Sequence, residues 1–201
     1  MRTARIAILT GLTVFAVGAC SNNAKEPLPE STTPTTTHPS IAVTVSPAPQ
    51  QRNNSGRPAV TFDPCIDIGD ATIQKLGFNP DTRKRNDLTA DSYTFLGCDF
   101  GQKDPDGLTV RSLDIKATNL TLQDFRERKT QSSNNTTVAG RDAVVYTLVG
   151  ATASITCFIA MDSPVGVIDL QLDLNPTKAS GRPCDQVRDI AEKLQPDLPK
   201  K

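Results

Sequence analysis

Alternation of hydrophobic and polar residues predicts strands in the second half of the chain. Two sets of hydrophobic residues recur at every second position: Ile155, Cys157, Ile159 and Met161, and then Ile168, Leu170, Leu172 and Leu174. A period of two is typical of a strand with one buried face. We expect strands at residues 142–149, 153–161 and 165–174, and the short connections between them predict an antiparallel meander.

An earlier part of the chain predicts a β-hairpin followed by a short helix. Residues 93–100 and 108–117 are strand candidates, and the segment Asp104-Pro105-Asp106-Gly107 between them fits a type I turn at each position. Thr121 is a candidate N-cap for a helix that would run through Lys129 and present two hydrophobic residues to the core.

Further segments have helical signatures. In residues 184–194 an apolar stripe falls at positions i, i+3, i+4 and i+7, formed by Val187, Ile190, Ala191 and Leu194. Asp63 is a candidate N-cap before Pro64. A helical turn from Asp70 as N-cap would end at Gly77, where a positive φ is favoured. These elements predict an α+β fold, with an antiparallel sheet and helices packed on one face.

The first twenty residues have the pattern of an export signal. Two arginines precede an uncharged apolar run at residues 6–17, which is shorter than the about 20 residues that span a bilayer. The segment Val17-Gly18-Ala19-Cys20 resembles the lipobox of bacterial lipoproteins. This resemblance implies that residues 1–19 are removed and that lipid on Cys20 anchors the protein to the extracytoplasmic side of the cell membrane. An ordinary secretory signal is the alternative.

Residues 20–58 are rich in Pro, Ser, Thr, Asn and Gln and contain few large apolar side chains. Such a composition buries too little surface to offset the entropy of ordering, so we expect a disordered tether. Its Thr-Pro tract at residues 32–37 is typical of an O-glycosylated stalk, and a bare linker is the alternative. Residues 59–201 are then expected to form a single globular domain, since their length supports one hydrophobic core.

The charge and histidine content of residues 59–201 exclude several functions. This range contains 17 Lys and Arg against 20 Asp and Glu, a net formal charge of −3, so nucleic acid is not an expected partner. The single histidine of the chain, His38, lies in the expected tether. The domain therefore cannot use Ser-His-Asp or Cys-His catalysis.

Four cysteines follow Cys20, and an even number in an exported chain predicts two disulfides. Three pairings are available. We favour Cys65 with Cys98 and Cys157 with Cys184, because Cys157 and Cys184 both fall on inward faces of their predicted elements. A zinc site is the alternative, but no pair shows the Cys-x₂₋₄-Cys spacing of such sites. We predict no metal, cofactor or catalytic residue.

Carboxylates in the predicted strands and turns are candidates for catalytic or calcium-binding groups. Asp169, Gln171 and Asp173 lie opposite the hydrophobic face of the last strand, and we expect a solvated sheet face there. Asp169 and Asp173 would be roughly 13 Å apart along the strand, wider than a glycosidase pair. Asp104 and Asp106 lack the glutamate of an EF-hand loop, so they predict a plain turn.

Two basic clusters are candidate surfaces for anionic lipid or acidic wall polymer. Arg83-Lys84-Arg85 is expected in a loop, and Arg126, Arg128 and Lys129 are expected on a helix. Clustered cations near such a surface each contribute about 1 kcal/mol. Solvated charge is the interpretation that we favour for both.

Several motifs together resemble a known family. Beside the lipobox and the Ser/Thr/Pro tether, they are Phe62-Asp63-Pro64-Cys65, Leu76-Gly77, Gly97-Cys98, Val138-Ala139-Gly140-Arg141-Asp142-Ala143, Cys157 and Cys184. The chain thereby resembles the actinobacterial lipoproteins of the domain-of-unknown-function family 3558, the group of LprB- and LprC-like proteins. The resemblance covers most of residues 59–197, and it implies a sheet-and-helix sandwich in the cell envelope without an established activity.

From these observations we expect a non-catalytic binding or structural module tethered outside the membrane. Its partner would be an envelope lipid, a polymer or a protein. The alternative is a histidine-free hydrolase acting on cell-wall or lipid substrates. Carboxylates that converge in three dimensions would favour the hydrolase, and an apolar pocket beside the meander would favour a lipid or small-molecule carrier.

Overall fold

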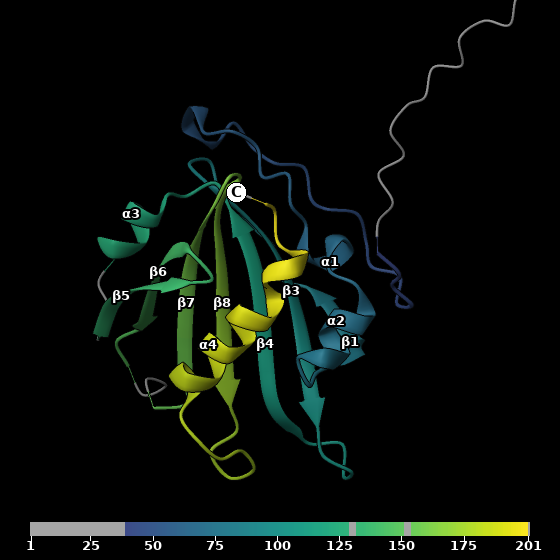
Figure 1. The fold of residues 1–201 in the computed structure, drawn as a ribbon. Helices are drawn as coiled ribbons and strands as arrows, with labels where there is room; N and C mark the ends of the chain where they lie inside the picture. Colours follow the sequence, from purple (N-terminus) through teal and green to yellow (C-terminus); the bar gives the residue numbers. More distant parts are fainter. Residues whose placement is uncertain (1–38, 129–131, 151–153, 201) are drawn as a thin grey trace, which may run out of the picture. The chain divides into compact units, whose positions relative to one another are not determined.

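The predicted strands are joined in one antiparallel sheet in a computed structural model that describes residues 39–128, 132–150 and 154–200. The expected signal peptide, Cys20, His38 and the predicted element ends Lys129 and Ala153 lie outside the described residues. In this part of the chain the strand order is β1-β3-β4-β8-β7-β6-β5 (Figure 1). The short strand β2 also pairs with β3. The strands are β1 (Asn79–Arg85), β2 (Leu88–Thr89), β3 (Thr94–Lys103), β4 (Thr109–Thr118), β5 (Ser132–Val138), β6 (Arg141–Thr147), β7 (Thr156–Ser163) and β8 (Gly166–Leu174).

The hairpin and the meander are confirmed. β3 and β4 pair antiparallel, and their turn is closed by a hydrogen bond of 2.9 Å from the amide of Gly107 to the carbonyl of Asp104. β6, β7 and β8 pair in sequence order, and β4 pairs with β8. The hairpin and the meander therefore form one continuous β-sheet.

The expectation of a loop at Arg83-Lys84-Arg85 was wrong, because these residues lie in β1. Arg83 is buried beneath the edge of the sheet, where it donates hydrogen bonds to the carbonyl of Cys65 at 3.0 Å and to Asp70 at 2.7 Å. Its guanidinium carbon lies 4.9 Å from the ring centroid of Phe100. A buried arginine, held through both terminal nitrogens of its guanidinium group, thus takes the place of an apolar residue. The strand therefore lacks the hydrophobic alternation that predicts strands.

The helices are α1 (Pro64–Asp67), α2 (Asp70–Lys75), α3 (Leu122–Arg126) and α4 (Pro183–Leu194). The Asp63 cap of α1 is confirmed, and the Thr121 cap of α3 forms a capping box. α2 is capped by Gly69 instead of Asp70. α3 ends at Arg126, earlier than expected, which leaves Arg128 in the segment after the helix.

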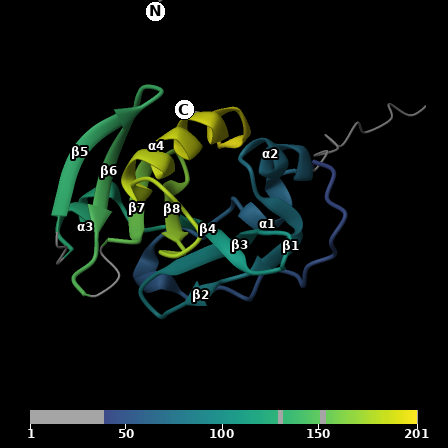
Figure 2. The ribbon, with the colours of Figure 1, turned by 90° about the horizontal axis from the view of Figure 1, so that it is seen from below.

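Three helices cover one face of the sheet. α4 packs on β7 and β8, while α1 and α2 contribute to the same core beside β1, β3 and β4 (Figure 2). Side chains of β4, β7 and β8 that are fully buried in this core include Leu113, Ile115, Ile159, Ile168 and Leu170. The two disulfides, Cys65–Cys98 and Cys157–Cys184, are the pairs that the sequence favoured, and they join this face to α1 and α4.

The opposite face of the sheet carries a second, smaller core. α3 packs there on β6 and β7 through Leu122 and Phe125. Aromatic side chains of three strands share this core, namely Phe95, Tyr146 and Phe158. One face is thus covered by α1, α2 and α4, and the other is covered by α3 over part of its area.

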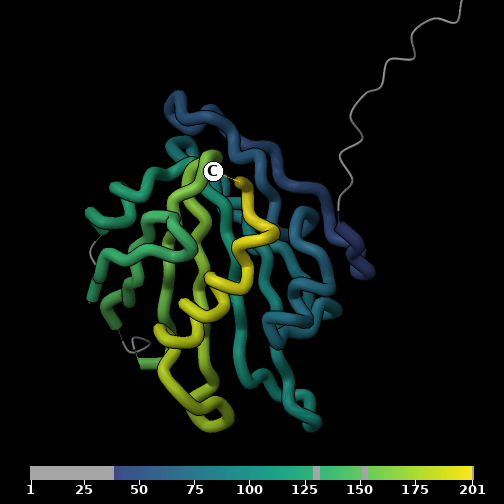
Figure 3. The backbone as a smooth tube through the Cα atoms, in the orientation of Figure 1, coloured from purple at the N-terminus to yellow at the C-terminus, as the bar shows by residue number. Residues whose placement is uncertain are grey.

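Residues 39–58, here called the N-terminal segment, lie along the domain (Figure 3). The side chain of Gln51 exchanges two hydrogen bonds of 2.8 Å with the backbone of Val60. Asn54 is buried and accepts a hydrogen bond of 2.9 Å from the hydroxyl of Thr94. Arg57 forms an ion pair with Asp124 at 3.2 Å. The part of the expected tether that the structure describes therefore contacts the sheet and α3.

Within the described residues, no helix is both long enough and apolar enough to cross a membrane.

Candidate functional site

Strand register brings polar and aromatic side chains together on the second face of the sheet. One row across five strands consists of Asp99, Asp114, Gln171, Phe158 and Tyr146, each opposite the next. The adjacent row places Lys116 opposite Asp169. Asp114 and Asp169 are therefore diagonal neighbours on β4 and β8, a relation that separates Cα atoms by about 7–8 Å.

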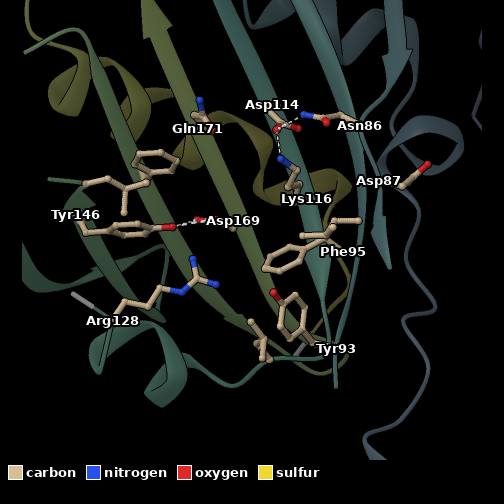
Figure 4. Close-up of a pocket in the computed structure, with 14 residues that line it drawn as sticks. Asn86, Asp87, Tyr93, Phe95, Asp114, Lys116, Arg128, Tyr146, Asp169 and Gln171 are labelled. Atoms are coloured by element: carbon tan, nitrogen blue, oxygen red, sulfur yellow. Dashed lines mark hydrogen bonds and ion pairs between the residues drawn. The ribbon is translucent and has the colours of Figure 1, made fainter. Parts of the chain in front are cut away.

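A cavity of about 760 Å³ opens over these rows (Figure 4). The sheet forms its floor, the segment between β1 and β2 forms one side, and the region after α3 forms the other. Its apolar wall consists of Leu88, Tyr93, Phe95, Leu120, Leu148 and Phe158. Leu88 and Leu148 are 51% and 40% exposed. A volume in this range, with apolar walls and few polar groups, is typical of small-molecule sites.

Gly97 allows the backbone at Asn86, which forms one side of the cavity, to approach β3 closely. A Cβ atom at this position would lie 2.4 Å from the carbonyl oxygen of Asn86, which is too close for any side chain. The amide of Asn86 instead donates to the carbonyl of Gly97 at 3.0 Å, and the amide of Gly97 donates to Asp87 at 3.0 Å. This close approach places the Asn86 side chain over β4.

Asp114 is a buried carboxylate on the floor of the cavity. Its Oδ2 atom pairs with the ammonium of Lys116 and accepts a hydrogen bond of 2.8 Å from Asn86. Its Oδ1 atom has no hydrogen-bond partner among the described residues. Burial raises the pKa of Asp114 to about 6, and the nearby charge of Asp99 contributes.

Tyr146 and Asp169 form the second polar pair of the floor. The Tyr146 hydroxyl lies 3.1 and 3.0 Å from the two carboxyl oxygens of Asp169, to which it donates. The tyrosine ring stacks on Phe158 with centroids 4.8 Å apart, which fixes its position. Burial raises the pKa of Asp169 from its ordinary value of 3.8 to about 7. Burial and the neighbouring carboxyl also raise the pKa of the Tyr146 hydroxyl.

Arg128 brings a positive charge to the same end of the cavity. Its guanidinium carbon lies 4.1 Å from the ring centroid of Phe125 and 5.9 Å from that of Phe95. Figure 4 shows the guanidinium group pointing toward the Tyr146 hydroxyl and Asp169. Its charge opposes the effect of burial on the pKa of Asp169.

Two expectations from the sequence are corrected by this geometry. The sequence predicts a solvated sheet face at Asp169, but this residue is only 7% exposed. The sequence predicts Arg128 as solvated charge on a helix, but the residue follows α3 and lines the cavity. The signal that could have revealed the site is the presence of aromatic residues at polar-face positions, since Phe95, Tyr146 and Phe158 share the face of Asp169.

The cysteines singled out from the sequence do not form part of this site. Cys65, Cys98, Cys157 and Cys184 belong to the core under α1 and α4 on the other face, and Cys20 is outside the described residues. Among the residues that the structure describes, no group of three His, Cys, Asp or Glu side chains is placed to hold a metal ion.

A protein-family model matches most of the chain. A family described as "Protein of unknown function (DUF3558)" matches residues 15–197, which include the lipobox-like segment and the whole described sheet. No curated protein and no solved structure matches the chain.

Proposed function

The chain belongs to the DUF3558 family of proteins of unknown function, and we propose that it is a lipid-anchored cell-envelope protein whose domain binds an amphiphilic small molecule. The observation that carries this proposal is the cavity on the second sheet face, which joins an apolar wall to a polar floor. Its apolar wall suits a hydrocarbon or ring system. The floor, with Asp114, Lys116, Tyr146 and Asp169, suits a polar end group.

Solvent-exposed apolar residues support a ligand site at this cavity. Large hydrophobic side chains that are exposed in the described residues are Leu88, Leu108, Leu148 and Val149. Two of them, Leu88 and Leu148, line the cavity, and Val149 follows Leu148 directly. Apolar side chains that are exposed to water around an opening are energetically unfavourable, and an apolar ligand that covers them removes this cost.

The proposal predicts that Leu148→Trp weakens ligand binding. The larger ring would occupy the opening, and because Leu148 is 40% exposed the change should leave the core intact. We expect the affinity for the uncharged fluorescent probe N-phenyl-1-naphthylamine, measured by titration, to fall about 10-fold, equivalent to about 1.4 kcal/mol.

The matched control is Leu108→Trp. Leu108 is 52% exposed in the β3–β4 turn and does not line the cavity, so this variant should bind the probe as the parent does. Equal loss in both variants, or no binding by the parent protein, would contradict the proposed site.

The second candidate function is a histidine-free hydrolase. It is favoured by one observation, that Asp114 and Asp169 are diagonal neighbours facing one cavity with pKa values raised to about 6 and about 7. Glycosidases use two carboxyls in comparable proximity, one of them protonated at neutral pH. We prefer binding because both oxygens of Asp169 are already engaged by Tyr146. Turnover of glycoside or ester substrates that is lost in both Asp114→Asn and Asp169→Asn would reverse this preference.

Anchoring through Cys20 is the other part of the proposal. It is supported by the two arginines, the apolar run and the lipobox-like segment. The family match includes the lipobox-like segment. The two disulfides also suit an oxidising compartment outside the cytoplasm. Two or three acyl chains on one residue would hold the protein stably at the membrane.

We predict that Cys20→Ala abolishes metabolic labelling of the protein by a clickable fatty acid. The variant should also keep its signal peptide, because the lipid-dependent cleavage site is gone. Ser21→Ala, the adjacent control, should be labelled and processed normally. The anchor assignment fails if Cys20→Ala is labelled as strongly as the parent in a gel-based assay.

A further inference from the structure

We propose that the ligand of the cavity is a monoanionic amphiphile, with its negative head group bound by Arg128 beside Tyr146 and Asp169 and its hydrocarbon part on the apolar wall. This inference rests on the proposed binding function and specifies the ligand class. It follows from which charged side chains around the cavity have an ion-pair partner and which do not.

The other charged groups of the cavity already have partners. Asp87 is held by Arg85, with Nε and Oδ2 at 2.6 Å, and Asp114 is paired with Lys116. Among the described residues, no carboxylate lies within ion-pair distance of Arg128. Arg128 instead faces the Tyr146 hydroxyl and Asp169. Because burial raises the pKa of Asp169 to about 7, this carboxyl is protonated at lower pH, and Arg128 is then the cation without a matching charge.

The surroundings of Arg128 favour a bound anion. Its guanidinium group lies over the ring of Phe125 at 4.1 Å and near that of Phe95, so part of its hydration is replaced by aromatic surface. A guanidinium group binds carboxylate, sulfonate or phosphate oxygens through two parallel hydrogen bonds. Such a pair is stronger beside apolar walls than in bulk water.

The apolar wall includes side chains near this charged end and side chains at the opening. Phe95 lies near Arg128, Tyr93 and Leu120 line the same cavity, and the partly exposed Leu148 and Leu88 border the solvent. A ligand whose head group meets Arg128 can therefore lay a hydrocarbon chain along the wall. A free fatty acid and an anionic lipid share this chemistry.

Asp169 makes this binding sensitive to pH. Tyr146 faces it from β6, Lys116 and Asp114 from β4, and Arg128 from the segment after α3. The opposite residue on β7, Ala160, carries no charge. A protonated Asp169 leaves the positive charge of Arg128 available to the ligand, whereas an ionised Asp169 neutralises it. With a pKa of about 7 for this carboxyl, anion binding should weaken as the pH rises from 6 to 8.

The test is isothermal titration of three ligands that share a ten-carbon chain and differ in the head group. At pH 6 we expect the parent protein to bind decanesulfonate about 10-fold more tightly than decanol, and decyltrimethylammonium most weakly. The affinity for decanesulfonate should fall about 10-fold at pH 8, as for a single ionisation near pH 7. The affinity for decanol should be the same at both values.

Two variants assign the effect to its residues. Arg128→Gln should bind decanesulfonate about 10-fold more weakly than the parent does, and its affinity for decanol should be unchanged. Asp169→Asn should remove the pH dependence of decanesulfonate binding. The control is Arg126→Gln, because Arg126 is exposed, hydrogen-bonds to Asn135 and does not line the cavity. It should leave all three affinities unchanged.

The outcomes separate this inference from the proposal on which it rests. Equal affinities of the parent protein for decanesulfonate and decanol would overturn the anionic ligand while supporting the cavity as a binding site, and this comparison needs no variant. Equal weakening of both ligands in Arg128→Gln would overturn the role of Arg128. If none of the three ligands bound the parent protein, the binding function itself would be contradicted.

Discussion

Replacement of Asp169 by asparagine is expected to stabilise the folded protein by up to about 4 kcal/mol at pH 8 and to leave its stability nearly unchanged at pH 4. Burial raises the pKa of this carboxyl from 3.8 to about 7. Each pKa unit corresponds to about 1.4 kcal/mol, so ionising Asp169 inside the protein opposes folding. Asparagine removes that ionisation and keeps an oxygen that can accept the hydrogen bond from Tyr146.

The direction of the pH dependence follows from the raised pKa. Between about pH 4 and pH 7 the folded state retains a proton on Asp169 that the unfolded chain has released. The stability associated with this proton is fully present below pH 4, is lost as the pH rises to 7, and stays lost above it. The difference between variant and parent should therefore grow over this window and then level off.

Urea unfolding of parent and variant at pH 4.5, 6 and 8 measures this difference. Asp142→Asn is the control, because Asp142 is an exposed carboxylate on β6 and its replacement should change the free energy of unfolding by no more than about 0.5 kcal/mol. If Asp169→Asn gave the same change at all three pH values, the carboxyl would not be buried as the structure describes.

The second large effect is expected for Leu194→Ala, which should lower the free energy of unfolding by about 2–5 kcal/mol. Leu194 is fully buried in the last turn of α4, in a stripe with Val187, Ile190 and Ala191 that packs on β7 and β8. Removing its methyl groups deletes apolar contacts and leaves a cavity between helix and sheet. Denaturant unfolding at constant pH is the measurement.

Lys193→Ala provides the comparison one position away. Lys193 is exposed and pairs with Asp189 at 2.7 Å on the solvent side of α4, so its loss should cost at most about 0.5 kcal/mol. Identical denaturant midpoints for both variants would mean that α4 does not hold the sheet through this stripe.

The elements that could be predicted from the sequence are those with one buried face. β7, β8 and α4 place apolar residues at periods of 2 and 3.6 because one side of each meets the main core. β1 and β5 lie at the two edges of the sheet, and their sequences are almost entirely polar. In β1 the paired Arg83 occupies a buried position that would otherwise hold an apolar residue, so hydrophobic periodicity does not reveal this strand.

The candidate site could not be predicted because its residues meet only through strand register. Asp114 and Asp169 are far apart in the sequence, and the pairing of β4 with β8 makes them neighbours. Arg128 reaches them because α3 ends early, and Asn86 reaches them because Gly97 has no side chain. Each residue taken alone has the pattern of solvated surface, and only their arrangement produces a partly enclosed cavity.

The N-terminal segment has a consequence for where a protease-resistant fragment of this protein begins. Gln51, Asn54 and Arg57 supply hydrogen bonds and an ion pair to the domain, and the carbonyl of Pro58 accepts one of 2.9 Å from Asn119. Trimming the chain back to residue 59 would leave the side chains of Thr94 and Asn119 without these partners. Limited proteolysis should therefore spare residues 51–58, and a recombinant fragment for crystallisation should include them.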